Sequence, residues 1–179
     1  MNSAAMQRHQ LEHIIRAAAG ITGAREFVIV GSQTVLGQFP QAPDELLASI
    51  EADLFSLRTP EDSDLIDGSI GEGSPFHQTF GYYAHGVGAE TAVLPAGWRE
   101  RLIPLRNENT GGGAGFCLEV HDLAVSKLVA GREKDLSFIT ALLRHRLADA
   151  HTIQERLTTT PLDSERRTLC EARLKRISS

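Results

Sequence analysis

The chain reads Phe-Val-Ile-Val-Gly-Ser at residues 27–32 and Glu-Ala-Asp at residues 51–53. The first stretch is a short run of β-branched and aromatic side chains, which predicts a buried strand that stops at the Gly-Ser pair. The second stretch places two carboxylates two positions apart. Because side chains alternate between the faces of a strand, Glu51 and Asp53 are expected on the same face. We therefore expect two acids beside a tight turn, where they can hold a divalent cation next to a phosphate.

The paired acids suit one kind of chemistry in particular. Phosphoryl and nucleotidyl transfer depend mostly on positioning and on the neutralisation of charge by metal ions. Mg²⁺ in such sites takes oxygen ligands from one or two carboxylates, from substrate phosphate and from water. The sequence therefore predicts a metal site at Glu51 and Asp53. The alternative is a solvent-facing strand edge, which often carries charges two positions apart.

The turn after the first strand offers groups that can bind phosphate. Gly31 lets the backbone bend sharply and lets an anion approach closely. Ser32 offers a hydroxyl, and the N–H groups of the helix expected at residues 32–36 form an anion site. Gln33 can add an amide donor. The alternative is a plain strand-to-helix turn in which Ser32 is an N-cap.

A second candidate segment, residues 123–135, reads Leu-Ala-Val-Ser-Lys-Leu-Val-Ala-Gly-Arg-Glu-Lys-Asp. Its first lysine, Lys127, interrupts an otherwise apolar run, which favours a functional role. Lysine binds phosphate as a compact charge, and arginine binds it as a planar bidentate donor. On a continuous helix, Lys127 and Lys134 would lie on one face about two turns apart. A solvated face with pairing between lysine and Asp135 is the alternative, and for Arg132 and Lys134 the two interpretations are equally supported.

Together, the Gly-Ser turn, the Glu-x-Asp pair and the Lys…Arg…Lys-Asp segment resemble the signature of the nucleotidyltransferase fold of the polymerase-beta superfamily. The chain is most similar to small bacterial members of the abortive-infection and toxin–antitoxin type, over residues 11–145. The resemblance implies an α+β fold, with a nucleotidyltransferase-like mixed β-sheet flanked by helices and a helical C-terminal subdomain. It implies transfer of a nucleoside monophosphate from an NTP to a hydroxyl acceptor on RNA, such as tRNA, or on a protein, with Mg²⁺ (or Mn²⁺). A cognate antitoxin protein is a further implied partner.

The resemblance also assigns roles to individual residues. It implies that Glu51, Asp53, Lys127 and Asp135 are catalytic, and that Glu51 and Asp53 hold the metal. Asp135 would complete the acidic set or orient a basic partner. Nucleotide phosphates would bind to the turn and to the basic residues of the second segment, namely Gly31, Ser32, Gln33, Lys127, Arg132 and Lys134.

Two features depart from the family pattern. The first acid is Glu51, where the family usually has aspartate, and the next expected strand reads Tyr-Tyr-Ala-His-Gly at residues 82–86, without a third acid. His85 on that strand can contact substrate, although we expect a structural histidine there. These departures favour an alternative function, a catalytically weak nucleotidyltransferase-fold module that binds nucleotide, RNA or a protein. An oligomeric scaffold without a ligand is a third alternative.

Composition places the chain among ordinary globular proteins, with 41% hydrophobic and 23% charged residues. We expect one compact unit, made of a nucleotidyltransferase-like core at residues 1–120 and a helical subdomain at residues 121–179. The net charge of −5 is uneven, because residues 1–120 hold 7 Lys and Arg against 15 Asp and Glu, whereas residues 121–179 hold 11 against 8. This asymmetry suits a metal on the acidic part and phosphates on the basic part, or a solvated helical surface.

Other features argue against a membrane-bound or secreted protein. No apolar run approaches about 18 residues, so no membrane span is expected. The first expected helix, Ala4–Ala18, contains charges and histidines and is no secretory signal. Cys117 and Cys170 are expected to be reduced thiols rather than a disulfide framework. We therefore expect a cytoplasmic protein.

Hydrophobic spacing predicts the remaining elements. Apolar side chains at helical spacing between Leu11 and Ala18 predict an amphipathic helix. The Gly111–Gly115 run is expected to be a hairpin loop, because it opens into a strand and lacks the ending of a phosphate loop. The other predicted elements are a strand at 49–57, helices within 61–80 with a break at 71–75, a hairpin of 82–87 and 91–94, a strand pair of 102–106 and 116–120, a helix with Asp122 as its N-cap, a helix with an apolar stripe over 136–143, and helices at 152–157 and 163–177.

Overall fold

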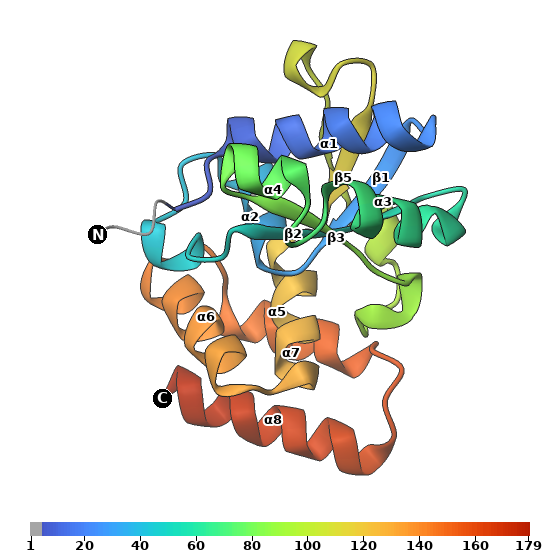
Figure 1. The fold of residues 1–179 in the computed structure, drawn as a ribbon. Helices are drawn as coiled ribbons and strands as arrows, with labels where there is room; N and C mark the ends of the chain where they lie inside the picture. Colours follow the sequence, from blue (N-terminus) through green and yellow to red (C-terminus); the bar gives the residue numbers. More distant parts are fainter. Residues whose placement is uncertain (1–4) are drawn as a thin grey trace. The chain divides into compact units, whose positions relative to one another are not determined.

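The computed structural model describes residues 5–179, which divide into two compact units. The first, which we call the sheet unit, comprises the chain up to Thr91 and the segment Leu102–Leu118. The second, which we call the helical unit, comprises Ala92–Arg101 and Glu119–Ser179. Their elements make an α+β fold with one mixed sheet, as the sequence predicted (Figure 1). No helix within residues 5–179 combines the length and apolar character needed to pass through a bilayer.

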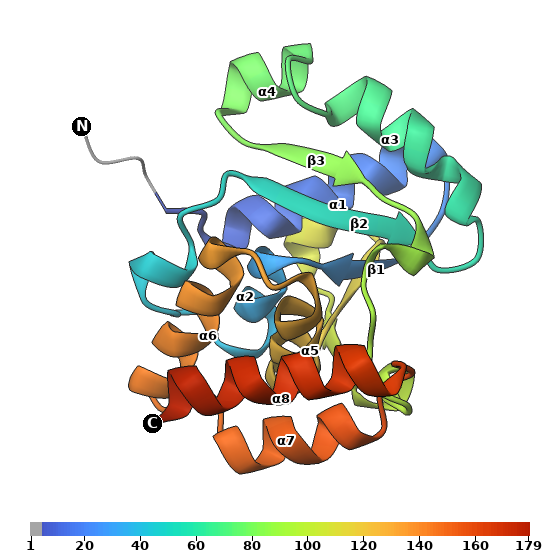
Figure 2. The same ribbon diagram turned by 90° about the horizontal axis from the view of Figure 1, so that it is seen from below.

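The strands of the sheet unit are β1 (Glu26–Val30), β2 (Glu51–Ser56), β3 (Tyr83–Gly86), β4 (Ile103–Leu105) and β5 (Ala114–Cys117). They form one sheet in the order β3-β2-β1-β5-β4. β1 pairs with β2 in antiparallel and with β5 in parallel orientation. β2 pairs with β3 in parallel orientation, and β4 pairs with β5 in antiparallel orientation. Figure 2 shows β1, β2 and β3 side by side, with β2 in the middle.

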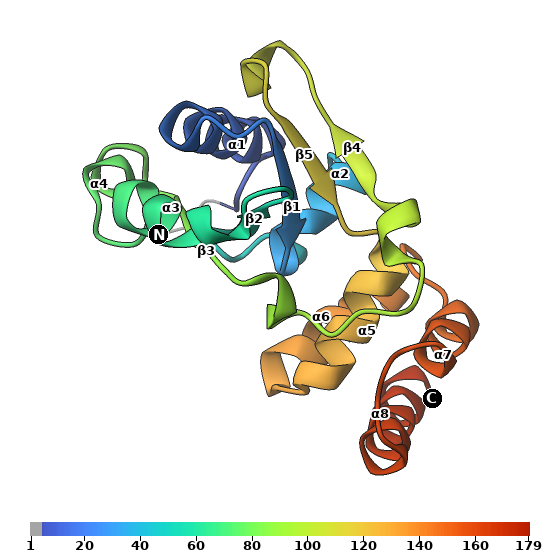
Figure 3. The ribbon, with the colours of Figure 1, turned by 90° about the vertical axis from the view of Figure 1, so that its right-hand side faces the viewer.

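The α-helices of the sheet unit are α1 (Arg8–Thr22), α2 (Val35–Gln38), α3 (Ser63–Ile70) and α4 (Pro75–Phe80). Figures 1 and 3 show α1, α3 and α4 on one side of the sheet. Two glycines show that α2 packs on the same face of β5 as α1. A Cβ on Gly115 would lie 2.5 Å from Ile15 of α1, and a Cβ on Gly37 of α2 would lie 2.5 Å from Cys117. Gly115 and Cys117 are two residues apart on β5, so their side chains share a face.

The interior of the sheet unit lies between α1 and the sheet. The apolar side chains that predicted an amphipathic helix, from Leu11 to Ala18, are fully buried. The expected start of this helix, Ala4, lies outside the described residues. Gly23 caps its C-terminus with a φ of 74°, a left-handed conformation that glycine adopts readily. The strands predicted at residues 27–30 and 49–57 are confirmed as β1 and β2.

The predicted hairpin of residues 82–87 and 91–94 is wrong. β3 pairs in parallel orientation with β2, and residues 91–94 form no strand. Instead, the chain from Ala92 enters the helical unit, where the Ala96 N–H donates to the Thr159 carbonyl at 3.0 Å. An apolar pattern predicts that a strand forms but does not identify the strand with which it pairs. The expected partner was the next apolar segment in sequence, and the actual partner of β3 is β2.

The α-helices of the helical unit are α5 (Val120–Ala130), α6 (Glu133–Arg144), α7 (Ala150–Thr158) and α8 (Ser164–Ser178). α5 packs against the other three, and α8 packs against α6 and α7 (Figure 3). Their shared interior is apolar and includes the buried side chains of Leu123, Leu128, Ile139, Leu142, Ile153, Leu157 and Leu174. The helices predicted over this part of the chain are thus present.

The link from β5 into α5 differs from the prediction. The strand pair expected at residues 102–106 and 116–120 is present as β4 and β5, but β5 is shifted toward the N-terminus. It begins at Ala114, inside the run expected to be a hairpin loop, and ends at Cys117. Asp122 is not the N-cap of α5. The Glu119 carboxylate fills that role and accepts hydrogen bonds from the N–H groups of His121 at 3.0 Å and Asp122 at 3.4 Å.

Candidate functional site

The acidic pair lies on β2 as the sequence predicted, with both side chains on one face. Ala52 and Leu54 point to the other face and are fully buried, whereas the side chains of Glu51 and Asp53 are 34% and 27% exposed. β2 is paired on both sides, with β1 and with β3. An internal strand therefore holds the two carboxylates in fixed positions.

The register of β3 brings a third polar side chain to this pair. Asp53 lies directly opposite His85 in the parallel pairing of β2 and β3. His85 Nδ1 is 3.5 Å from Glu51 Oε1 and 3.3 Å from Asp53 Oδ1. One ligand atom from each of the three residues lies within 4.8 Å of the others. His85 is half-exposed beside the acids, on the strand where the sequence lacks a third acid.

Tyr83 is a member of the site that the sequence did not identify. Its hydroxyl donates a hydrogen bond to Glu51 Oε2 at 2.9 Å. Burial, together with the hydrogen bond to Glu51 and nearby negative charge, raises the pKa of Tyr83 to about 12. The hydroxyl thus keeps its proton and holds one oxygen of Glu51, which leaves Oε1 on the side of His85. The only sequence signal was a tyrosine two positions before the histidine.

Gly31 packs directly against Asp53. It has a φ of 73° and a ψ of −173°, a backbone conformation that other residues rarely adopt. A Cβ at this position would lie 2.5 Å from Asp53 Oδ2. Thr34 braces the turn, because its hydroxyl donates to the Ile29 carbonyl at 2.9 Å and accepts from the Leu118 N–H at 2.6 Å. The Gly-Ser turn and the acids are therefore neighbours.

The turn itself is shorter than the helix expected at residues 32–36. It is a 3-10 turn, Ser32–Thr34, followed by the four-residue α2. Gln33 is 1% exposed, its Nε2 donates to the Ser49 carbonyl at 2.6 Å, and its Oε1 has no hydrogen-bond partner among residues 5–179. Gln33 thus ties the turn to the start of β2. Phosphate binding by Gly31, Ser32 and Gln33 stays a prediction.

The two carboxylates are electrostatically coupled. Burial raises the pKa of Asp53 to about 7, and the neighbouring Glu51 carboxylate adds to the rise. Burial alone would also raise the pKa of Glu51, but the neighbouring Asp53, the hydrogen bond from Tyr83 and the nearby His85 imidazole lower it. Two acids this close share one proton when no cation lies between them.

The donor set fits a divalent metal ion. Asp53 Oδ1 is a buried oxygen with no hydrogen-bond partner in the described part of the chain. Its 3.3 Å separation from His85 Nδ1 is an electrostatic contact whose alignment falls short of a hydrogen bond. A buried carboxylate oxygen of this kind needs a cation or a proton. Two carboxylates and an imidazole supply oxygen and nitrogen ligands that divalent ions bind.

The Lys127 segment is divided between two helices. α5 ends at Ala130, Gly131 takes a φ of 66°, and α6 starts at Glu133. The expectation that Lys127 and Lys134 share one face of a continuous helix is therefore wrong. The physical reason is Gly131, which ends α5 in the left-handed conformation.

Lys127 is buried beside Asp135 within the helical unit. Its Nζ lies 3.3 Å from Asp135 Oδ1 and 4.5 Å from the centre of the Phe138 ring. Arg132 Nε donates to Asp135 Oδ2 at 2.7 Å. Burial lowers the pKa of Lys127 and is opposed by the Asp135 charge. Burial would raise the pKa of Asp135, but Arg132 and Lys127 lower it. Lys134 is exposed, and the nucleotide-binding roles of this segment stay predictions.

A comparison with known families places the chain in one of them. A family model described as "Nucleotidyltransferase of unknown function" (DUF6036) matches residues 9–169. The chain belongs to this family. Its membership confirms the resemblance to nucleotidyltransferases, and the matched segment contains every candidate site residue named above. No curated protein and no solved structure matched the chain.

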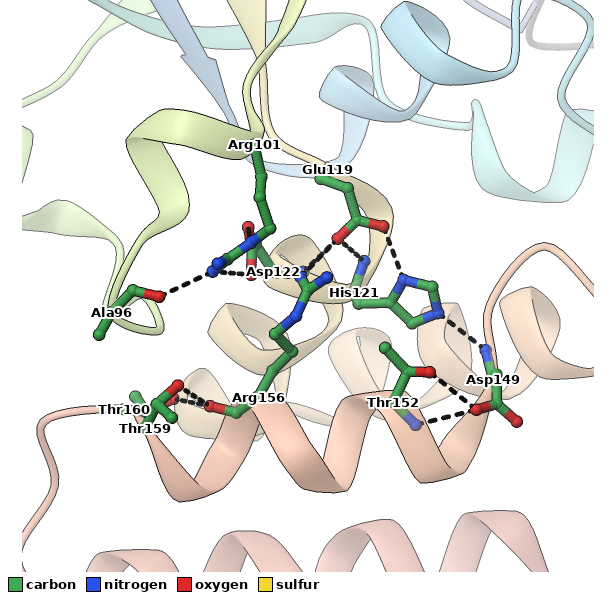
Figure 4. Close-up of polar contacts among 10 residues, drawn as sticks. All are labelled: Ala96, Arg101, Glu119, His121, Asp122, Asp149, Thr152, Arg156, Thr159 and Thr160. Atoms are coloured by element: carbon green, nitrogen blue, oxygen red, sulfur yellow. Dashed lines mark hydrogen bonds and ion pairs between the residues drawn. The ribbon is translucent and has the colours of Figure 1, made fainter.

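In this member of the nucleotidyltransferase family, a polar network lies inside the helical unit (Figure 4). Asp122 is fully buried, and its carboxylate accepts two hydrogen bonds from Arg101 at 2.9 Å and one from Arg156 at 2.8 Å. Arg156 also donates to Glu119 at 2.8 Å. His121 Nδ1 lies 2.6 Å from Glu119. Because these side chains bind one another, we interpret the network as structural. It links the segment Ala92–Arg101 to α5 and α7.

Proposed function

We propose that the chain is a metal-dependent nucleotidyltransferase that uses an NTP and a hydroxyl acceptor. One observation carries the proposal: Glu51 and Asp53 lie beside the Gly31 turn, and a buried oxygen of Asp53 has no hydrogen-bond partner within residues 5–179. A divalent ion, Mg²⁺ or Mn²⁺, held by these carboxylates would neutralise charge on the phosphates. Membership of a nucleotidyltransferase family supports the reaction class.

In the proposed reaction, the oxygen of the acceptor hydroxyl forms a bond to the α-phosphorus of the NTP. The bond between that phosphorus and the bridging oxygen breaks, pyrophosphate leaves, and the hydroxyl proton passes to solvent. Glu51 and Asp53 would position the ion, while the Tyr83 hydroxyl would keep Glu51 in place. Gly31, which has no side chain, would let a phosphate oxygen approach the backbone, with Ser32 and Gln33 as further contacts.

Residues of the helical unit have a proposed role as well. Asp135 would orient Lys127, and the 3.3 Å ion pair between them supports this. Lys127, Arg132 and Lys134 would bind nucleotide phosphates, as the resemblance implies. The proposed acceptor is RNA, such as tRNA, or a protein, and a cognate antitoxin is the proposed partner.

A second candidate function is a binding module of the same fold with little turnover. Two departures from the family pattern favour it: Glu51 stands where the family usually has aspartate, and the strand that follows the pair has no third acid. Such a module would bind nucleotide in the presence of metal but would transfer no nucleoside monophosphate. The two candidates therefore differ in a single measurable step.

The experiment incubates the purified protein with each α-labelled NTP, Mg²⁺ or Mn²⁺, and total cellular RNA or protein. We expect label transfer by the parent protein, none by Asp53→Asn, and normal transfer by Asp64→Asn, which alters an exposed carboxylate on α3. Metal-dependent NTP binding without transfer would favour the binding module. If neither metal nor NTP binds to the parent, both candidates are wrong.

A further inference from the structure

We propose that His85 is the third protein ligand of the metal ion, and that its nitrogen makes the site prefer first-row transition ions to Mg²⁺. The inference rests on the proposed function, because it concerns the ion that Glu51 and Asp53 would hold. It adds a ligand that the sequence pattern did not supply, and it changes the expected identity of the ion.

The spacing of the three donor atoms supports this assignment. His85 Nδ1 lies 3.3 Å from Asp53 Oδ1 and 3.5 Å from Glu51 Oε1, and no pair in the set exceeds 4.8 Å. Ligands about 2.1 Å from one ion lie about 3 Å apart at neighbouring positions and about 4 Å apart at opposite positions. Small side-chain rotations would therefore bring all three donors onto one ion.

The scaffold around the donors is already organised. Asp53 and His85 are direct partners on adjacent paired strands, so backbone hydrogen bonds fix their separation. The Tyr83 hydroxyl holds Glu51 Oε2 and leaves Oε1 for the cluster. Hydrogen bonds of this kind orient metal ligands and strengthen binding.

A plain ion pair between His85 and the acids is the competing explanation. It gives the buried Asp53 Oδ1 an electrostatic contact with His85 Nδ1 at 3.3 Å but no hydrogen bond within the described chain. An ion between the three side chains would satisfy this oxygen, the imidazole nitrogen and Glu51 Oε1 together. The absence of a hydrogen bond to Asp53 Oδ1 within the described residues therefore favours a ligand role for His85.

The identity of the ion follows from the chemistry of the donors. Mg²⁺ takes oxygen ligands in near-octahedral geometry. Imidazole nitrogen binds first-row transition ions well, with affinity rising from Mn²⁺ to Co²⁺ and beyond. An imidazole in place of a third carboxylate also removes one negative charge, which weakens the attraction for Mg²⁺ most, because that ion depends on charged oxygen ligands. The site should thus discriminate in favour of Mn²⁺, Co²⁺ or Zn²⁺.

The test compares binding of Co²⁺ and Mg²⁺ by calorimetry in the parent protein, in His85→Asp and in His9→Asp. His9 is exposed on α1, so the second variant makes the same charge change away from the site. We expect the ratio of Co²⁺ to Mg²⁺ affinity to fall about tenfold or more in His85→Asp and to stay at the parent value in His9→Asp. The visible absorption bands of bound Co²⁺ should also change in His85→Asp only, since they report the loss of a nitrogen ligand.

An unchanged affinity ratio and an unchanged Co²⁺ spectrum in His85→Asp would overturn the inference. If both ions then still require Asp53, the proposed metal site stands and only the role of His85 is wrong. If neither ion binds to the parent, the inference and the proposed function are both wrong. Should His85→Asp fail to fold, imidazole ¹⁵N resonances of the parent decide: an equivalent of Zn²⁺ should shift the His85 signal, and an unmoved signal refutes the ligand role.

Discussion

The Asp53 carboxylate occupies the space that a side chain on Gly31 would need, since a Cβ there would lie 2.5 Å from Asp53 Oδ2. The glycine that ends β1 and the acid on β2 are therefore one structural feature. Asp53 can be mostly buried beside the turn only because residue 31 has no side chain. Any change at either residue should affect both the turn and the proposed metal ligands.

Gly31→Ala should destabilise the protein and weaken metal binding together. The positive φ and the clash with Asp53 should lower the free energy of unfolding by about 3 kcal/mol, and displacement of Asp53 should reduce Mn²⁺ affinity about tenfold or more. Gly23→Ala is the control, because Gly23 has a φ of 74° but open space around a Cβ. It should lower stability by about 1 kcal/mol and leave metal affinity unchanged. Parent-like Mn²⁺ binding in Gly31→Ala would contradict the arrangement.

Tyr83→Phe should weaken metal binding with little effect on the fold. The change removes the hydrogen bond that positions Glu51, so Mn²⁺ affinity should fall about tenfold, while the free energy of unfolding changes by about 1 kcal/mol. Tyr82→Phe is a matched control, since the Tyr82 hydroxyl lies 2.6 Å from His13 Nδ1 and away from the acids. Calorimetric titration of both variants tests the difference, and equal affinities would remove Tyr83 from the site.

Glu119 should make the free energy of unfolding depend on pH under acidic conditions. Burial alone would raise the pKa of Glu119, but hydrogen bonds from His121 and Arg156 lower it to about 2. The folded-state pKa lies below the unfolded value of 4.5, so the stabilisation by the Glu119 carboxylate is fully present above that pH and is lost as the pH falls toward 2. The two pKa values correspond to at most about 3 kcal/mol.

Urea unfolding of the parent and of Glu119→Gln measures this effect. The parent should be more stable by up to about 3 kcal/mol near pH 6, and the difference should shrink by pH 3. Glu61→Gln, which changes an exposed acid, should follow the parent at every pH. A stability difference that does not vary with pH would show that the charge of Glu119 is not what stabilises the network.

Lys127→Ala should weaken triphosphate binding more than monophosphate binding. An ammonium group interacts most strongly with the β- and γ-phosphates, which carry most of the negative charge. Lys134→Ala changes an exposed lysine of the same segment and should have a smaller effect. Titrations with an NTP and the matching NMP distinguish the two variants. The same loss for both nucleotides, or no loss, would rule out a phosphate-binding role for Lys127.

Local spacing predicted much of the sheet unit. The burial of Ala52 and Leu54, which alternate with Glu51 and Asp53, follows from alternation on a strand. The helix over residues 11–18 follows from its apolar period. The break after Lys127 was also local, since Gly131 was visible in the sequence, but a glycine within a helical pattern does not by itself say whether the helix ends or continues. Such ambiguity explains the wrong expectation of one continuous helix.

The sequence by itself determined that Glu51 and Asp53 share a strand face and follow a strand that ends in Gly31, because both facts depend on residues a few positions apart. Only the tertiary structure decided that His85 and Tyr83 join them. Tyr83 meets Glu51 across a separation of 32 residues, and that meeting depends on the parallel register of β3 against β2. Register is set by the apolar surface that the whole unit buries, so no short stretch of sequence contains it.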